Sequence, residues 1–458
     1  MIFNINSHKH SVPAFIKGTL ILTAAGLISR LIGFFYRIYL SRCFGEENIG
    51  IYQLITPVIS LGFSLCAAGY QTAVSKLAAE AAAGCTSPYS VQSRKPLYAS
   101  LLISLPLSLL CTFLTYTLAE PIGTILLKEP RTVILLKIIA FSFPFVGIHA
   151  CINGWFYGMK KAGLPSAAQL IEQLTRVACV YLITGKAISA GRLPDISAAV
   201  FGLTIGELIS MTVAIVTFLP YCDNRTHEPE KSPSLSFLTF LPSLLSTALP
   251  LTANRLVINL LGSAESVAIP EMLRRFGYDT ETALSVFGVL TGMALPLIFF
   301  PNALTGSVAV MLLPMISENC CLQKYHTVKR LTFRTLKYCL LMGFGCLLVF
   351  TLGGPFLGKI LFHSTLAGRC IRTLGFICPF LYLDTTLSGI LQGIGKSGVL
   401  FLVNIFCLLT RLAFVYLAVP FFGLQGYLWG MLTGQLLLTA LYLLCLHRFF
   451  KALPAVSA

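Results

Sequence analysis

The sequence predicts an all-α polytopic membrane protein, with about twelve transmembrane helices in two pseudo-symmetric six-helix bundles. Three observations lead to this prediction. The 458 residues have a mean hydropathy of +0.82. Only 11% of them are charged, whereas soluble domains carry about 25%. Long apolar runs recur along the chain, and part of the first half resembles part of the second.

The predicted spans follow from the rule that a helix needs about 20 mostly apolar residues to cross a bilayer. The first run carries Arg30 near its middle and is too long for a signal peptide, so we expect no cleaved leader. Pro296 and Pro301 predict a kink in the eighth span. The spans are 16–40, 48–75, 97–119, 132–158, 164–185, 196–220, 236–260, 283–317, 335–354, 370–394, 398–419 and 424–446.

A polar stretch near the middle of the chain, Cys222–Ser234, predicts a linker between two lobes. We therefore expect an N-terminal lobe over 1–221, a cytoplasmic linker over 222–235 and a C-terminal lobe over 236–458. The two termini and the even-numbered loops hold the larger share of Lys and Arg, so the positive-inside rule predicts cytoplasmic termini in the plasma membrane.

An internal repeat supports the two lobes. Residues 154–182 align without a gap to 389–417, with 11 of 29 positions identical, including Thr175-Arg176 and Thr410-Arg411. The next helix repeats a Gly-xxx-Gly pattern at Gly202 and Gly430. Six spans per lobe give both lobes the same direction through the membrane. Parallel repeats of this kind are typical of transporters with a substrate site between the lobes.

Several classes of protein are excluded. The net charge of +16 is scattered through short loops, which argues against nucleic acid as a partner. The fifteen cysteines mostly lie in apolar runs without metal-ligand spacing, and the seven histidines are dispersed. We find no catalytic motif, so we predict that the chain is not an enzyme and has no metal or cofactor.

The main functional signal is an excess of bases within the predicted spans. A charge at the bilayer centre costs about 2.5–3.5 kcal/mol on insertion scales. An anion that visits the membrane interior would explain the excess. The bases are Arg30, Arg37, Lys76, Lys137, Arg176, Arg255 and Arg411, and the acids are Glu172, Glu207 and Asp384.

Arg30 is the leading candidate for substrate contact. Gly26, Arg30, Gly33 and Arg37 follow i, i+4, i+7, i+11 spacing and share one helix face. Guanidinium binds phosphate through two parallel charged hydrogen bonds and does not deprotonate. Arg37 lies near the helix end, so snorkelling to the interface is the alternative for that residue.

Four further residues complete the predicted substrate site. Arg255 and Asn254 lie in the first helix of the second lobe, opposite Arg30 if the lobes superpose. Lys76 shares a helix face with Gly69 and Thr72. Asn302 follows Pro301, where a kinked helix lines a cavity or merely packs.

The remaining charged residues have structural interpretations. Arg176 and Arg411 occupy equivalent repeat positions, and Arg176 follows Glu172 by four residues, so we expect an ion pair within a lobe. Lys137 is expected to snorkel. Glu207 and Asp384 are either relay groups for a coupling ion or acids paired with a neighbouring base.

Several motifs resemble those of a known family. They are Lys17-Gly18-Thr19-Leu20, Ile28-Ser29-Arg30-Leu31-Ile32-Gly33-Phe34, Gly50-Ile51-Tyr52-Gln53-Leu54 and the segment Gly69–Leu77. The chain resembles the stage V sporulation protein B and polysaccharide exporter family, within the multidrug/oligosaccharidyl-lipid/polysaccharide (MATE-like) flippase superfamily.

The resemblance implies two six-helix bundles that flip an undecaprenyl-pyrophosphate-linked glycan by alternating access, in cell-wall synthesis during sporulation. It implies membrane lipid and cell-wall polymerases as partners, and a role for Arg30 at the pyrophosphate. Arg37 is displaced by one residue from the second arginine of the lipid II flippase pattern, and the second helix has only Lys76.

Two alternatives stay open. One is a multidrug exporter coupled to a cation, which needs acids in the membrane, and the other is a scaffold that does not transport. The driving force is the membrane potential or a monovalent ion.

Overall fold

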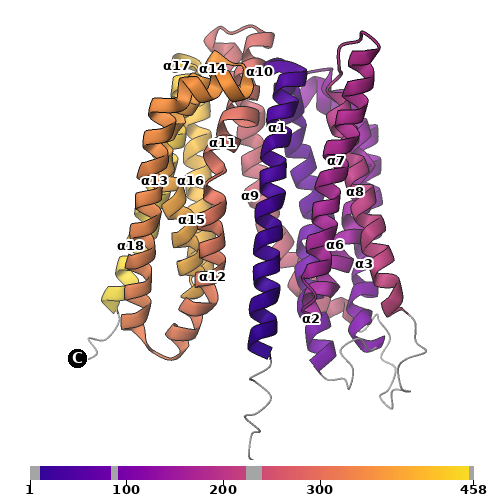
Figure 1. Ribbon diagram of the computed structural model, residues 1–458, viewed down its shortest axis with the longest axis vertical. Helices are drawn as coiled ribbons and strands as arrows, with labels where there is room; N and C mark the ends of the chain where they lie inside the picture. The colour runs from indigo at the N-terminus through magenta and orange to yellow at the C-terminus, as the bar shows by residue number, and fades with distance from the viewer. Residues whose placement is uncertain (1–10, 84–90, 223–239, 453–458) are drawn as a thin grey trace, which may run out of the picture. The chain divides into compact units, whose positions relative to one another are not determined.

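The computed structural model describes residues 11–83, 91–222 and 240–452, which are almost entirely helical and contain no β-strand (Figure 1). This confirms the predicted fold class. Contacts divide the described chain into two compact units. The first comprises Met1–Tyr36 and Ile55–Asn259, and the second comprises Arg37–Leu54 and Leu260–Ala458.

The first unit contains five long helices and several short segments, together with both ends of α1 (Ser11–Phe63) and the first part of α9 (Leu241–Phe276). In chain order these are η2 (Ser64–Ala68), α2 (Gly69–Ala83), α3 (Val91–Thr117), α4 (Ala119–Pro121), η3 (Ile122–Leu126), α5 (Thr132–Ala140), α6 (Ser142–Gly158), α7 (Gly163–Ser189), α8 (Ser197–Phe218) and η4 (Leu219–Tyr221).

The second unit contains the middle of α1, the rest of α9 and the remaining helices. These are α10 (Thr280–Gly288), η7 (Val289–Ala294), α11 (Leu295–Phe299), α12 (Asn302–Cys321), α13 (Tyr325–Phe362), α14 (Thr365–Leu374), η8 (Gly375–Ile377), α15 (Cys378–Gly393), α16 (Ser397–Leu417), α17 (Val419–Phe422) and α18 (Leu424–Ala452).

The units differ from the predicted lobes in two segments, since Arg37–Leu54 groups with the second unit and the start of α9 groups with the first. Most of the predicted linker 222–235 lies outside the described residues. The predicted lobe boundaries therefore stay a prediction.

Eleven stretches of the described residues are long and apolar enough to cross a membrane. The first, Ala24–Ala83, has 60 residues and holds two predicted spans, because non-helical Gly45 (φ 78°, ψ 176°) interrupts it. A positive φ of this size suits glycine. The predicted span 164–185 forms α7, which is not among the eleven.

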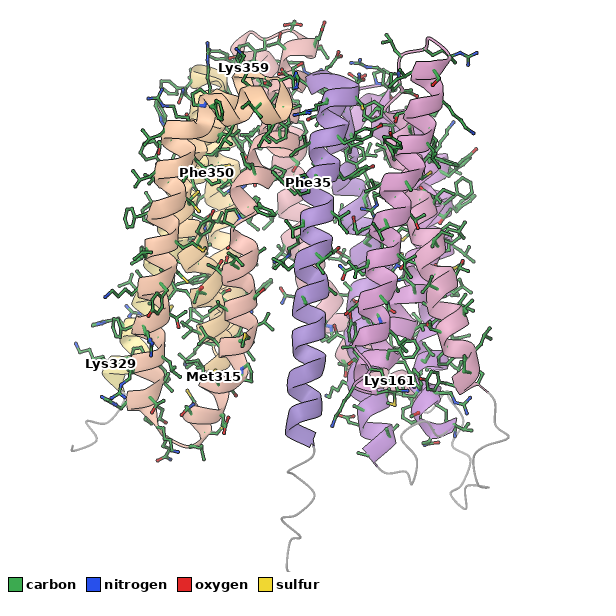
Figure 2. All side chains as sticks on the ribbon, viewed as in Figure 1. Phe35, Lys161, Met315, Lys329, Phe350 and Lys359 are labelled. Atoms are coloured by element: carbon green, nitrogen blue, oxygen red, sulfur yellow. The ribbon has the colours of Figure 1, made fainter. Side chains whose placement is uncertain are left out.

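The predicted kink in 283–317 is a break between α11 and α12, next to Pro301. The hydroxyl of Tyr382 donates to the carbonyl of Ile298 at 3.0 Å, which satisfies a carbonyl at the end of α11. By contrast, the prediction 335–354 is too short, because α13 has 38 residues, or about 57 Å. Lys329 and Lys359 lie near its two ends (Figure 2), and polar residues such as these hid the extensions from a search for apolar runs.

The repeated glycines pack in the same way inside each unit. In the first unit, a Cβ on Gly154 of α6 would lie 2.5 Å from the carbonyl oxygen of Gln71 in α2. In the second, a Cβ on Gly389 of α15 would lie 3.0 Å from the carbonyl oxygen of Ala309 in α12. Glycine is needed at both positions because the neighbouring backbone is so close.

The Gly-xxx-Gly pattern of α8 and α18 has an equivalent role. A Cβ on Gly206 would lie 3.2 Å from the carbonyl oxygen of Glu172 in α7, and one on Gly434 would lie 2.6 Å from Cγ of Arg411 in α16. Each repeated Thr-Arg helix thus packs against its repeated glycine helix (Figure 1). The sequence repeat is therefore also a repeat of packing.

Candidate functional site

Arg30 and Arg37 are both exposed on α1. Their spacing of seven residues places them on the same side of the helix, as predicted. Contacts assign Arg30 to the first unit and Arg37 to the second. The predicted site that combines these side chains with the second half of the chain stays a prediction.

Lys76 is exposed and lies next to an acid of its own helix. Its Nζ is 3.9 Å from Oε1 of Glu80, and the two side chains are 60% and 58% exposed. An exposed i, i+4 pair of this kind is worth about 0.3–0.5 kcal/mol. Lys76 is thus held weakly and is accessible to another anion.

Asn254 and Arg255 lie on the first part of α9, and both are exposed. This segment packs against α2 and η2. A Cβ on Gly69 would lie 2.7 Å from the carbonyl oxygen of Ala248, and Asn259 donates to Ser64 Oγ at 2.5 Å. Arg255 makes no ion pair with any residue that the structure describes.

Asn302 has a local structural role at the start of α12. Its Oδ1 accepts hydrogen bonds from Thr305 at 2.6 Å and from Thr385 of α15 at 2.8 Å. The side chain ties the two helices together next to the break at Pro301. The predicted substrate contact is untested, but two hydroxyls already occupy this amide oxygen.

The first unit contains a largely buried network of ionisable groups between α6, α7 and α8. Arg176 lies 2.8 Å from Glu172 and 3.6 Å from Glu207. Nε2 of His149 lies 3.0 Å from Oε2 of Glu207, and Asn153 lies 3.4 Å from Nδ1. The predicted pairing of Arg176 with Glu172 is confirmed. Glu207 is likewise an acid paired with neighbouring bases.

In the second unit, Arg411 pairs with an acid of another helix. Its Nη2 lies 2.7 Å from Oε1 of Glu265, which also accepts from Tyr427 at 3.2 Å. The sequence placed Glu265 in a loop after a span ending at 260, and this is wrong. The helix α9 continues to Phe276, and Glu265 is buried within it.

Asp384 is buried in α15 and is bound by neutral donors from α18. Gln435 donates to Oδ2, and Thr439 donates to Oδ1 at 2.8 Å. The alternative in which this acid pairs with a neighbouring base is therefore wrong. The neutral donors satisfy the hydrogen bonds of this buried carboxyl group.

Sequence reasoning missed the network around His149, although a signal was present. The offset of 235 that aligns the repeats also pairs His149 with Asp384, and the next repeated helix pairs Glu207 with Gln435. Each repeat therefore joins two equivalent helices through one acid: α6 to α8 in the first unit, and α15 to α18 in the second. The acid lies on α8 in the first unit and on α15 in the second.

Burial differs between the acids and most of the bases that come from the predicted spans. The described acids Glu172, Glu207, Glu265 and Asp384 are at most 12% exposed and are all hydrogen-bonded. No group of three or more His, Cys, Asp or Glu within the described ranges is suited to a metal ion. Of the seven bases counted above, Arg30, Arg37, Lys76, Lys137 and Arg255 are exposed, whereas Arg176 and Arg411 are partly buried and paired with acids.

Known proteins of similar sequence identify the family of this chain. Residues 15–320, about two thirds of the chain, match the profile of a family described as "Polysaccharide biosynthesis protein". The chain belongs to the polysaccharide biosynthesis protein family. This confirms the resemblance stated from the motifs of the first 80 residues.

Relatives of this polysaccharide biosynthesis family member cover most of its length. It is 28% identical to "Stage V sporulation protein B" of Bacillus subtilis (strain 168), over 93% of this chain and 82% of that protein. It is 23% identical to "Lipid II flippase MurJ" of the same organism, over 83% and 73% of the two chains.

A solved inward-facing MATE family transporter of the MOP superfamily has a similar fold, with a TM-score of 0.72 at 15% identity. The match covers 96% of this chain and all of that one. Together these comparisons show a multi-pass membrane protein with a MATE-like fold. The relatives whose names state an activity are a flippase and a transporter, which supports the prediction that the chain is not an enzyme.

Proposed function

We propose that this protein flips an undecaprenyl-pyrophosphate-linked glycan, a peptidoglycan precursor or a related polysaccharide, across the plasma membrane by alternating access. The observation that carries the proposal is the sorting of charge. The acids from the predicted spans, Glu172, Glu207 and Asp384, are largely buried and hydrogen-bonded inside the units, whereas Arg30, Arg37, Lys76 and Arg255 are exposed. Such a surface suits an anionic cargo.

In this proposal the pyrophosphate contacts Arg30 and Arg255 in a cavity open to the cytoplasm, with Lys76, Arg37, Asn254 and Asn302 as further contacts. The lobes then rock, and the lipid-linked anion is released in the outer leaflet. A negative-inside potential drives an anion outward by about 2.3 kcal/mol per charge per 100 mV, so nucleotide hydrolysis is not required. Both termini are cytoplasmic in this arrangement.

The relatives support the class of cargo. One is named for a stage of sporulation and another for flipping lipid II. We therefore propose a cell-wall glycan as the cargo and spore formation as the process, with cell-wall polymerases as consumers of the flipped product. A multidrug exporter that takes cations needs accessible acids, which the buried carboxylates do not favour.

The test is flipping by purified protein in liposomes that contain a fluorescent undecaprenyl-pyrophosphate glycan. Arg30→Ala should reduce the flipping rate at least tenfold, because a charged hydrogen bond contributes about 1.5–3 kcal/mol. Arg334→Ala is the matched control, since Arg334 is also exposed but lies near the start of α13, outside the predicted spans. Full activity of Arg30→Ala would remove the proposal, and wild-type liposomes without flipping would favour the scaffold.

A further inference from the structure

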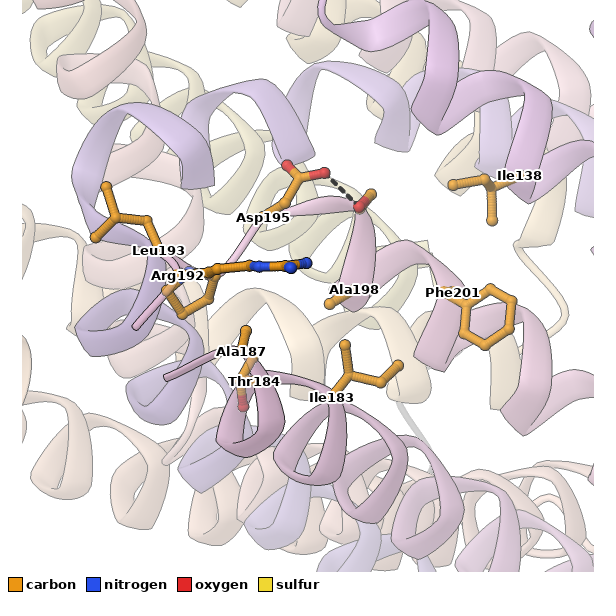
Figure 3. A pocket seen from close by; sticks show the side chains of 11 residues that line it. Ile138, Ile183, Thr184, Ala187, Arg192, Leu193, Asp195, Ala198 and Phe201 are labelled. Carbon is orange, nitrogen blue, oxygen red and sulfur yellow. Dashed lines mark hydrogen bonds between the residues drawn. The ribbon is translucent and has the colours of Figure 1, made fainter. Parts of the chain in front are cut away.

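A groove of about 320 Å³ lies between α5, α7 and α8 in the first unit (Figure 3). This volume is at the lower end of the range for small-molecule sites, roughly 300–1,000 Å³. None of the predicted substrate residues lines the groove. Its floor is apolar and is formed by Ile138, Ile183, Ala187 and Phe201.

The rim of the groove is the loop that joins α7 to α8, and it carries one charge of each sign. Arg192 and Asp195 both line the groove and are exposed. Figure 3 shows the Arg192 side chain extending across the opening, with Asp195 beside it. Oδ2 of Asp195 accepts from Ser197 Oγ at 2.5 Å, and within the described chain Arg192 and Asp195 form no ion pair. Each charge is therefore accessible to a ligand.

The position along the helices places the groove at the edge of the bilayer. Ala187 lies in the last turn of α7, and Phe201 is the fifth residue of α8, about 6 Å along its axis. Leu193, at the tip of the loop, is 94% exposed, which suits a side chain in contact with lipid rather than water. The apolar floor thus faces the depth of acyl chains, and the rim faces the depth of headgroups.

We propose that this groove is a binding site for phosphatidylethanolamine. The lipid phosphate binds the guanidinium of Arg192, the primary ammonium donates to the carboxylate of Asp195, and one acyl chain lies along Ile183 and Phe201. The headgroup has one negative and one positive charge, and the rim offers one residue of opposite charge to each of them. Choline cannot donate hydrogen bonds to Asp195, and a phosphatidylglycerol headgroup has no cation to offset that carboxylate.

The experiment is native mass spectrometry of the purified full chain with phosphatidylethanolamine, phosphatidylcholine or phosphatidylglycerol of identical acyl chains. The wild-type protein should retain phosphatidylethanolamine at least several-fold better than either other lipid. Arg192→Gln should weaken retention of all three by roughly tenfold, because a charge-assisted hydrogen bond is lost. Lys186→Gln is the matched control, since Lys186 is an exposed cation near the end of α7 that does not line the groove.

The rim acid gives a sharper test. Asp195→Asn should abolish the preference for phosphatidylethanolamine over phosphatidylcholine and increase retention of phosphatidylglycerol, because the repulsion of its phosphate is removed. Ala187→Phe should fill the groove and reduce retention of all three lipids. Soluble glycerophosphoethanolamine should not displace the lipid, since it lacks the acyl chain that contacts the floor.

Three results would overturn the site: equal retention of the three lipids by the wild-type protein, an unchanged preference in Asp195→Asn, or displacement of the lipid by the soluble headgroup. The measurement is lipid retention rather than transport. The proposed lipid site can therefore be confirmed or refuted independently of the proposed flipping activity.

Discussion

Nε2 of His149 lies 3.0 Å from Oε2 of Glu207, and both side chains are largely buried inside the first unit. This contact joins α6 to α8, as the bond from Gln435 to Asp384 joins α15 to α18 in the second unit. The two repeats therefore conserve the place of a polar bond while exchanging which helix carries the acid. Substitutions that remove these bonds or the close glycine contacts should therefore lower the stability of each unit.

Removal of the shared acid should destabilise the first unit. Glu207→Ala takes a carboxylate away from both His149 and Arg176. Arg176 keeps Glu172 at 2.8 Å, but the buried ring of His149 loses its partner, and a buried polar group left unsatisfied costs about 1–3 kcal/mol. The melting temperature of the purified protein should fall clearly, whereas Glu80→Ala, which breaks the exposed pair with Lys76, should leave it almost unchanged. Equal melting temperatures for the two variants would contradict this account.

The pair of Arg411 and Glu265 should show strong coupling. Arg411→Met or Glu265→Leu alone leaves one buried charge and should cost about 3–5 kcal/mol. The double variant removes both charges and fills similar volume, so it should be more stable than either single variant. A double-mutant cycle of thermal denaturation measures this coupling. Additive losses would show that the two side chains do not stabilise one another.

Close backbone contact should make Gly154 intolerant of alanine. The added Cβ would lie 2.5 Å from the carbonyl oxygen of Gln71, so α6 and α2 must separate. Overpacking of this kind costs about 1–3 kcal/mol. Gly26→Ala is the matched control, because nothing lies within 4 Å of its added Cβ. Alanine there should stabilise helix α1 by about 0.5–1 kcal/mol, and a lower melting temperature for Gly26→Ala than for Gly154→Ala would refute the packing.

The cap of α10 should give a pH-dependent contribution to stability. Hydrogen bonds from the hydroxyl and the backbone N–H of Thr282 hold the pKa of Asp279 below its usual value. Because the pKa is lower in the folded state, the contribution is present above the ordinary value of about 3.9 and is lost as the pH falls through the folded value. The melting temperature of wild type relative to Asp279→Asn should therefore be higher at pH 6 and should decline below about pH 4. A difference that is constant down to pH 3 would exclude this role of the carboxylate.

The sequence alone determined the class of fold, the repeat and the pairing of Arg176 with Glu172. Hydropathy fixes which stretches are helices in a membrane, because backbone polar groups must bond internally there. The 3.6-residue period fixes which residues share a helix face, so a pair four residues apart is visible without coordinates. The matched glycines of the repeat already marked the helices that pack closely in each unit.

Only the tertiary structure decided which partners come from other helices. Glu265 was assigned to a loop because the apolar run weakens before it, yet α9 continues and buries this acid against Arg411. Asp384 accepts hydrogen bonds from neutral donors rather than from a base, and His149 contacts Glu207, which is 58 residues away in the sequence. Pairs this distant depend on how helices pack, and side-chain packing leaves no periodic trace in a single sequence. The sequence therefore predicts the helices and their repeated pattern, whereas the packing of the helices determines the partner of each buried charged side chain.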